Sequence, residues 1–155
     1  MRSIAVSGFL AVILVTPVAV AQTPKDLEGC WKMRSLVIEK AGEKTEPYGP
    51  NPIGQLLLSP DGHFSNIHMR SDLSPAANLQ PTGGVVGTII AYFGTYQVQG
   101  KEVVVKIEGS SRSDWRNTTA KRAAESVSAD KLVWVDRPEP DMTVRVNYDR
   151  CAGRD

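Results

Sequence analysis

The amino-acid sequence predicts an all-β protein: an eight-stranded antiparallel up-and-down β-barrel that follows a cleaved signal peptide. Eight short segments at even spacing carry strand-like patterns, and helical periodicity is almost absent. The first and last of these segments each hold one cysteine, Cys30 and Cys151. Pairing these two strands antiparallel, with the cysteines opposite each other, closes the sheet into a barrel that has no open edge.

The first 21 residues have the pattern of a secretory signal peptide. Arg2 precedes an apolar run over residues 4–15, and Pro17 and Ala19-Val20-Ala21 follow it. The run is shorter than the roughly 20 apolar residues that span a bilayer, so we expect cleavage after Ala21 and no membrane span. The predicted mature domain is then 22–155, secreted or periplasmic.

The predicted mature chain has a neutral charge balance, with 17 basic and 17 acidic residues once Arg2 is removed. This balance gives no reason to expect a nucleic-acid partner or attraction to an anionic membrane surface. Hydrophobic residues make up 41% of the whole sequence, which is enough to bury a core. Export places Cys30 and Cys151 in an oxidising compartment, where one disulfide is expected.

The eight predicted strands are short and are separated by loops and turns rich in glycine, proline and aspartate. They cover residues 29–39, 53–59, 63–70, 89–98, 101–109, 118–128, 131–136 and 142–151. In the first strand Trp31 and Met33 share a face, and a change of parity near Ser35 predicts a β-bulge. Residues 41–44 are expected to form a loop. Residues 71–88 are expected to form a long surface loop of a kind that often borders a site.

The fourth and fifth strands form the clearest predicted pair, joined by Gln99-Gly100 as a two-residue turn. The predicted opposite residues are Val98 and Lys101, Tyr96 and Val103, Gly94 and Val105, and Tyr92 and Ile107. One face of this pair is apolar and is expected to face the core: Ile90, Tyr92, Tyr96, Val98, Val103, Val105 and Ile107. Lys106 and Glu108 lie on the other face.

The last two predicted strands return the chain to the first one. In the seventh, Leu132 and Trp134 share a face, and in the eighth alternate residues from Met142 to Arg150 do so. With Cys30 opposite Cys151, Trp31 lies opposite Arg150 and both side chains point inward. We therefore expect Trp31 and Arg150 to have a structural role in closing the barrel.

Several motifs resemble the lipocalin-like domain family of small bacterial and fungal barrels. Gly29-Cys30-Trp31 together with Arg150 is similar to the lipocalin G-x-W signature, in which the arginine packs across the tryptophan at the closed end. The other matching segments are residues 47–54, 59–62, 69–70, 91–96 and 108–110, with Trp115 and Arg122. The resemblance spans Leu27 to the C-terminus and implies a lipocalin (calycin-like) barrel. Similar small barrels also serve as cyclases or isomerases in natural-product pathways.

The candidate ligand-binding residues are aromatic and basic side chains expected on inner faces or near the mouth: Tyr92, Tyr96, Arg122, Trp115, His68 and Arg70. Tyrosine hydroxyls on an apolar wall could bind a ligand carbonyl, act as acids, or be satisfied within the core. Arg122 matches a family position and could bind a carboxylate, or be an exposed charge. Trp115 could cap the mouth or fix its own loop.

Two alternatives stay open for the strand over 63–70. His68 and Arg70 share a parity with Phe64 and would line the mouth if that face is inward; in the other parity, Ile67 and Met69 are inward. His63 and His68 lie five residues apart on one strand and point to opposite faces, so we expect no shared metal site. No cofactor is expected, and no serine, cysteine or histidine pattern assigns a catalytic residue.

The sequence leaves three functions to compare. The first is a binding module that holds a small hydrophobic or amphipathic molecule inside the barrel. The second is a cofactor-independent cyclase or isomerase that uses Tyr92, Tyr96 or Arg122. The third is a structural envelope protein whose barrel is filled by its own side chains. A cavity of roughly 300 Å³ or more would count against the third, and strongly shifted ionisation inside it would favour the second. The sequence indicates neither the ligand nor the oligomeric state.

Overall fold

A computed structural model describes residues 23–72 and 89–153 of the chain. The predicted signal peptide and nearly all of the predicted long loop lie outside these residues. The described elements are α1 (Pro24–Leu27), β1 (Gly29–Lys40), β2 (Glu43–Thr45), β3 (Ile53–Leu58), β4 (His63–Met69), β5 (Ile89–Gln99), β6 (Glu102–Ser110), η2 (Ser113–Trp115), β7 (Thr118–Val127), β8 (Lys131–Glu139) and β9 (Met142–Arg150).

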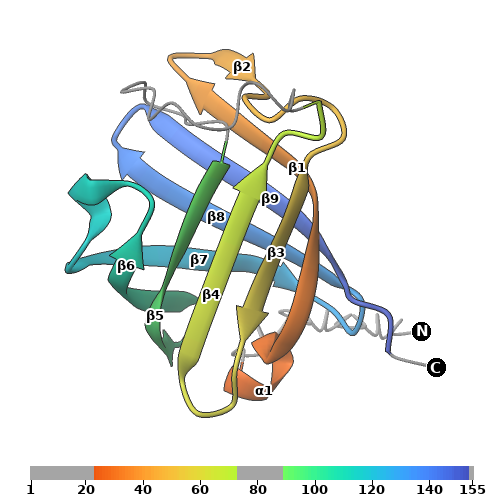
Figure 1. Ribbon diagram of the computed structural model, residues 1–155, viewed down its shortest axis with the longest axis vertical. Helices are drawn as coiled ribbons and strands as arrows, with labels where there is room; N and C mark the ends of the chain where they lie inside the picture. The colour runs from red at the N-terminus through yellow and green to blue at the C-terminus, as the bar shows by residue number, and fades with distance from the viewer. Residues whose placement is uncertain (1–22, 73–88, 154–155) are drawn as a thin grey trace, which may run out of the picture.

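The strands form one antiparallel sheet that closes on itself (Figure 1). From β3 to β9 each strand pairs with the next in the chain, while β1 pairs with both β3 and β9. The predicted eight-stranded up-and-down barrel is therefore confirmed. A helix long and apolar enough to cross a bilayer was not found within residues 23–72 and 89–153.

β2 is a ninth, short strand where the sequence was interpreted as a loop, so that interpretation was wrong. It pairs with the end of β1 around a turn in which Ala41 and Gly42 have positive φ. All three residues of β2 are exposed, so no alternation of apolar and polar residues marks it as a strand.

β1 is long because it serves two neighbours. Its first residues pair with β3, and residues from Trp31 onward pair with β9. The predicted β-bulge is confirmed, since the register with β9 shifts between Met33 and Ser35. The bulge changes the inward parity: Trp31 and Met33 are buried before it and Leu36 after it.

The predicted register of β5 and β6 was wrong by two residues. Gln99 pairs with Glu102, so the turn is Gly100-Lys101, with Gly100 at φ +66°. A glycine with positive φ at the first central position suits a two-residue hairpin, whereas the prediction put Gln99 there.

The two-residue error leaves the faces of this hairpin unchanged, because side chains alternate with a period of two. The register is Val98 with Val103, Tyr96 with Val105, and Gly94 with Ile107; a bulge after Phe93 then sets Tyr92 opposite Ser110. The expected apolar face is therefore turned to the core, and Lys106 and Glu108 are exposed.

The closed end of the barrel has the predicted register. A disulfide joins Cys30 to Cys151, and Trp31 lies opposite Arg150. The Arg150 guanidinium carbon lies 4.0 Å from the centre of the Trp31 ring. The Trp31 indole N–H donates to the Leu27 carbonyl at 2.7 Å, which fixes α1 beneath the barrel.

Arg150 also binds three backbone carbonyls near this end. Its Nη1 donates to Glu28 at 2.8 Å, its Nη2 to Asp26 at 3.1 Å and its Nε to Ala129 at 2.5 Å. One side chain on β9 thus connects α1, the residue before β1 and the turn before β8.

We expect Arg150→Met to lower the free energy of unfolding by about 2 kcal/mol, because it removes charge-assisted hydrogen bonds and a cation–π contact. The control is Arg145→Met on the same strand, whose ion pair with Glu125 is exposed and should contribute less than about 1 kcal/mol. Urea denaturation of both variants measures the difference. Equal losses would contradict a closing role for Arg150.

Candidate ligand-binding cavity

A cavity of about 430 Å³ lies inside the barrel, toward the end opposite the disulfide. One part of its wall is aliphatic and comes from β1, β5 and β9: Leu36, Ile38, Ile90, Met142, Val144 and Val146. Leu36 and Ile38 face inward because they follow the bulge in β1. The β-bulge in β1 thus turns two of its side chains toward the cavity.

A buried polar network lies on the inner faces of β4, β5 and β9. The Asn66 amide donates to the Tyr92 hydroxyl at 2.8 Å, and His68 Nε2 lies 3.0 Å from the Tyr148 hydroxyl in a hydrogen bond. Asn66 and Tyr148 are also within hydrogen-bond distance of each other, at 3.4 Å. All four side chains are buried. On β4, the face with Phe64, Asn66 and His68 is therefore the inward one, which resolves the alternative left open by the sequence.

Burial keeps the network uncharged at neutral pH. It lowers the pKa of His68 to about 4, and the positive charge of Arg122 adds to this effect. Burial also raises the pKa of Tyr92 and, well above its ordinary value, that of Tyr148. The pKa of Tyr48, which packs edge-on against His68, is raised for the same reason.

One ion pair lies in the cavity wall, between β7 and β8. Arg122 and Asp136 are opposite each other in the register, and Arg122 Nη1 lies 2.7 Å from Asp136 Oδ1. Arg122 is only 7% exposed. Burial raises the pKa of Asp136, and the lowering effect of the Arg122 charge is the smaller of the two.

The mouth of the cavity is covered in part by Trp115, from η2. Its ring contacts Tyr92 edge-on, with centroids 5.3 Å apart, and Arg112 lies over it at 4.8 Å. Two ion pairs hold charged residues of the rim, Lys40 with Glu139 and Arg112 with Asp114. The rim also includes Pro138, which belongs to β8 because that strand extends past Asp136, where the sequence predicted its end.

The structure brings four of the six candidate residues together around this cavity: Tyr92, Arg122, Trp115 and His68. Tyr96 and Arg70 do not line it. The Tyr96 hydroxyl donates to the Ser59 carbonyl at 2.9 Å, nearer the closed end. Arg70 lies beyond the end of β4 and binds Asp72 and the Pro47 carbonyl.

Sequence reasoning missed several polar groups that line or support the cavity, namely Tyr48, Asn66, Trp134, Asp136 and Tyr148. The parity of β4 could have indicated Asn66, since an amide on an otherwise buried face needs a partner. Within the described residues, no three histidine, cysteine, aspartate or glutamate side chains are grouped to hold a metal ion.

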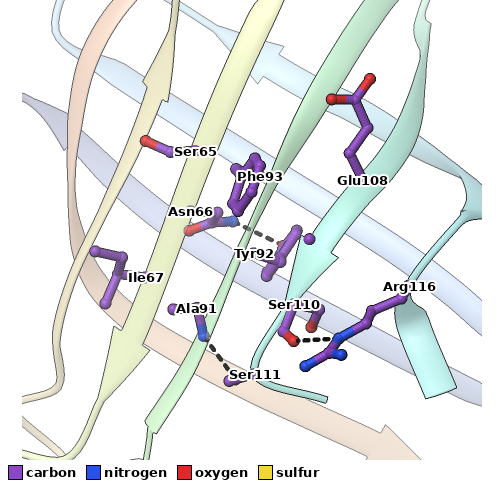
Figure 2. Close-up of a pocket in the computed structure, with 11 residues that line it drawn as sticks. Ser65, Asn66, Ile67, Ala91, Tyr92, Phe93, Glu108, Ser110, Ser111 and Arg116 are labelled. Atoms are coloured by element: carbon purple, nitrogen blue, oxygen red, sulfur yellow. Dashed lines mark hydrogen bonds between the residues drawn. The ribbon is translucent and has the colours of Figure 1, made fainter. Parts of the chain in front are cut away.

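A second hollow, of about 590 Å³, lies over β4, β5 and β6 and is lined in part by the buried residues Asn66 and Tyr92 (Figure 2). It is open to solvent, and Ile67 and Phe93 are exposed at its edge. The Phe93 ring covers Gly109, where a Cβ atom would come within 2.4 Å of it. Figure 2 shows Arg116 donating a hydrogen bond to the Ser110 carbonyl at this hollow. The interior cavity is more enclosed and is lined by four of the six candidate residues, so we regard it as the candidate site.

Comparison with known proteins gives a family match. Residues 28–140 match the family model of the lipocalin-like domain. No curated protein matches the chain significantly. A lipocalin-like protein from Bacteroides uniformis ATCC 8492 is similar in structure, with 16% identity, a TM-score of 0.49 and coverage of 81% of this chain and 99% of that one. A biogenic amine-binding protein gives 14% identity, a TM-score of 0.46 and coverage of 81% and 64%.

Proposed function

Because this chain belongs to the lipocalin-like domain family, we propose that it is an exported barrel that binds a small hydrophobic or amphipathic molecule in its interior. The observation that carries the proposal is the cavity of about 430 Å³. Sites for small molecules commonly measure about 300–1,000 Å³ and combine an apolar wall with a few polar groups. A barrel filled by its own side chains would not leave this space, so the cavity counts against a purely structural role.

The distribution of polar groups favours an amphipathic ligand. The aliphatic residues of β1 and β9 offer a surface for an apolar body. Polar and charged groups are concentrated on the β7 and β8 side, where Arg122 and Asp136 lie, and at the rim. The proposed ligand-binding residues are therefore Tyr92, Arg122, Trp115 and His68.

Acid–base catalysis works best when a group has a pKa near the working pH. The pKa of His68 lies near 4, and the pKa values of Tyr92 and Tyr148 are raised. These directions make His68 a weak base and the tyrosines weak acids, which favours binding over catalysis. The raised pKa of Asp136 is the one observation that favours the second candidate, a cofactor-independent cyclase or isomerase.

Export is part of the proposal. It is supported by the signal-peptide pattern over residues 1–21 and by the disulfide between Cys30 and Cys151, which persists in oxidising compartments. N-terminal sequencing of protein recovered from the medium or the periplasm checks it, and we expect the mature chain to begin at Gln22.

A variant with a filled cavity tests the proposed site. We expect Val144→Trp to weaken binding of the uncharged fluorescent probe N-phenyl-1-naphthylamine by at least about tenfold, because the indole occupies the space of the ligand. The matched control is Thr143→Trp, which changes the neighbouring residue of β9 that does not line the cavity. If circular dichroism shows both variants folded and Val144→Trp binds like wild type, the probe does not bind in this cavity.

A further inference from the structure

Trp134 lines the cavity, and its indole N–H is an unsatisfied hydrogen-bond donor. Trp134 is only 4% exposed. Of all the buried side-chain nitrogen and oxygen atoms in the described residues, only its Nε1 has no hydrogen-bond partner. Buried donors in folded proteins are nearly always paired, and one left unpaired destabilises the fold. An unpaired donor at the edge of a cavity is explained if a bound molecule supplies the acceptor.

The two cross-strand neighbours of Trp134 supply no side-chain acceptor. Trp134 lies opposite Ala124 on β7 and Val146 on β9, and both of these side chains are apolar. Asp136, which lies two residues after Trp134 on β8, also lines the cavity. Its carboxylate is already paired, because Asp136 Oδ1 lies 2.7 Å from Arg122 Nη1. Trp134 therefore lies between the aliphatic residues of β9 and the ion pair in the order of the cavity wall.

The charges around the cavity decide which kind of acceptor fits. The charge of Arg122 is balanced by Asp136, and the rim pairs Lys40 with Glu139 and Arg112 with Asp114. Among the described residues that line the cavity, each cation is paired, so a ligand carboxylate would add a buried anion with no counter-charge, which is strongly unfavourable. A carbonyl oxygen accepts the same N–H bond and brings no charge.

We infer that the cavity binds an uncharged molecule with a carbonyl oxygen, such as a ketone, ester or quinone, and that the Trp134 N–H orients it. The carbonyl lies near the Arg122–Asp136 pair, and the apolar body packs on the β1 and β9 side. This inference rests on the proposed function, since it specifies the ligand class of the same cavity. It also explains a buried tryptophan nitrogen that the packing of the barrel leaves unpaired.

Three naphthalenes of similar size test the inference by competition with N-phenyl-1-naphthylamine. 2-Acetylnaphthalene carries a carbonyl, 2-isopropenylnaphthalene replaces its oxygen with a methylene group, and 2-naphthoate carries a charge. Wild type should bind the ketone about tenfold more tightly than the alkene, as expected for one neutral hydrogen bond. It should bind the naphthoate more weakly than the ketone.

Trp134→Phe should abolish the preference for the ketone while changing the affinity for the alkene less than about threefold. The control is Tyr96→Phe, which removes a hydrogen-bond donor from an aromatic side chain that does not line the cavity and should keep the preference. Equal binding of ketone and alkene by wild type, a preference that survives in Trp134→Phe, or tighter binding of the naphthoate would each overturn the inference and leave the proposed function standing. Failure of wild type to bind any of the probes would overturn both.

Discussion

The double variant Cys30→Ala/Cys151→Ala is expected to lose about 5 kcal/mol of unfolding free energy, more than any other change considered for this barrel. The disulfide joins residues 121 positions apart, nearly the whole described chain. A crosslink over so long a loop removes much conformational freedom from the unfolded state. It also holds together β1 and β9, the two strands whose pairing closes the sheet.

Urea denaturation of wild type and the double variant measures this loss. Wild type treated with a reductant should unfold at the same urea concentration as the untreated variant, and the reductant should not affect the variant. A loss below about 1 kcal/mol would contradict the account, because the Trp31–Arg150 contacts and the strand pairing would then close the barrel without the crosslink.

A second large effect is expected from pH, through His68. In the unfolded chain this histidine takes up a proton near pH 6.5, whereas in the barrel its pKa is about 4. Between these values the unfolded state binds more protons, so stability falls as the pH is lowered. The contribution of neutral His68 to the free energy of unfolding is complete above about pH 7, and about 3 kcal/mol of it is lost by pH 4.

The two histidines of the chain provide a matched pair of variants for this prediction. His68→Gln removes the titrating group and should flatten the stability curve between pH 7 and pH 4. His63→Gln changes an exposed residue and should follow wild type. Denaturant midpoints at several pH values measure the curves. Parallel curves for wild type and His68→Gln would show that His68 does not carry the effect.

The closure of the barrel was predictable because its signals are local and paired. Alternation placed Trp31 and Arg150 on inner faces, and the two cysteines fixed how the end strands align. The β5–β6 register could not be predicted in the same way. Gln99-Gly100 and Gly100-Lys101 are both plausible two-residue turns, and only the backbone conformation at Gly100 distinguishes them. β2 escaped prediction because both its faces meet solvent.

The candidate site was predictable in part. Alternation marked Tyr92 as inward, and the resemblance to the family indicated Arg122 and Trp115. The pairing of Arg122 with Asp136 could not be derived, since β7 has a weak pattern and a bulge after Ala124. The sequence also placed Trp134 on a shared face with Leu132. Whether its N–H finds an acceptor depends on which side chains surround it in three dimensions, and alternation carries no information about that.

The central claim is that the barrel holds a small molecule, and native mass spectrometry of protein purified from its own host tests it most directly. We expect part of the wild-type protein to carry additional noncovalent mass that collisional activation releases, and Val144→Trp purified in parallel to lack it. A bare protein mass for wild type, together with no binding of N-phenyl-1-naphthylamine, would contradict the claim.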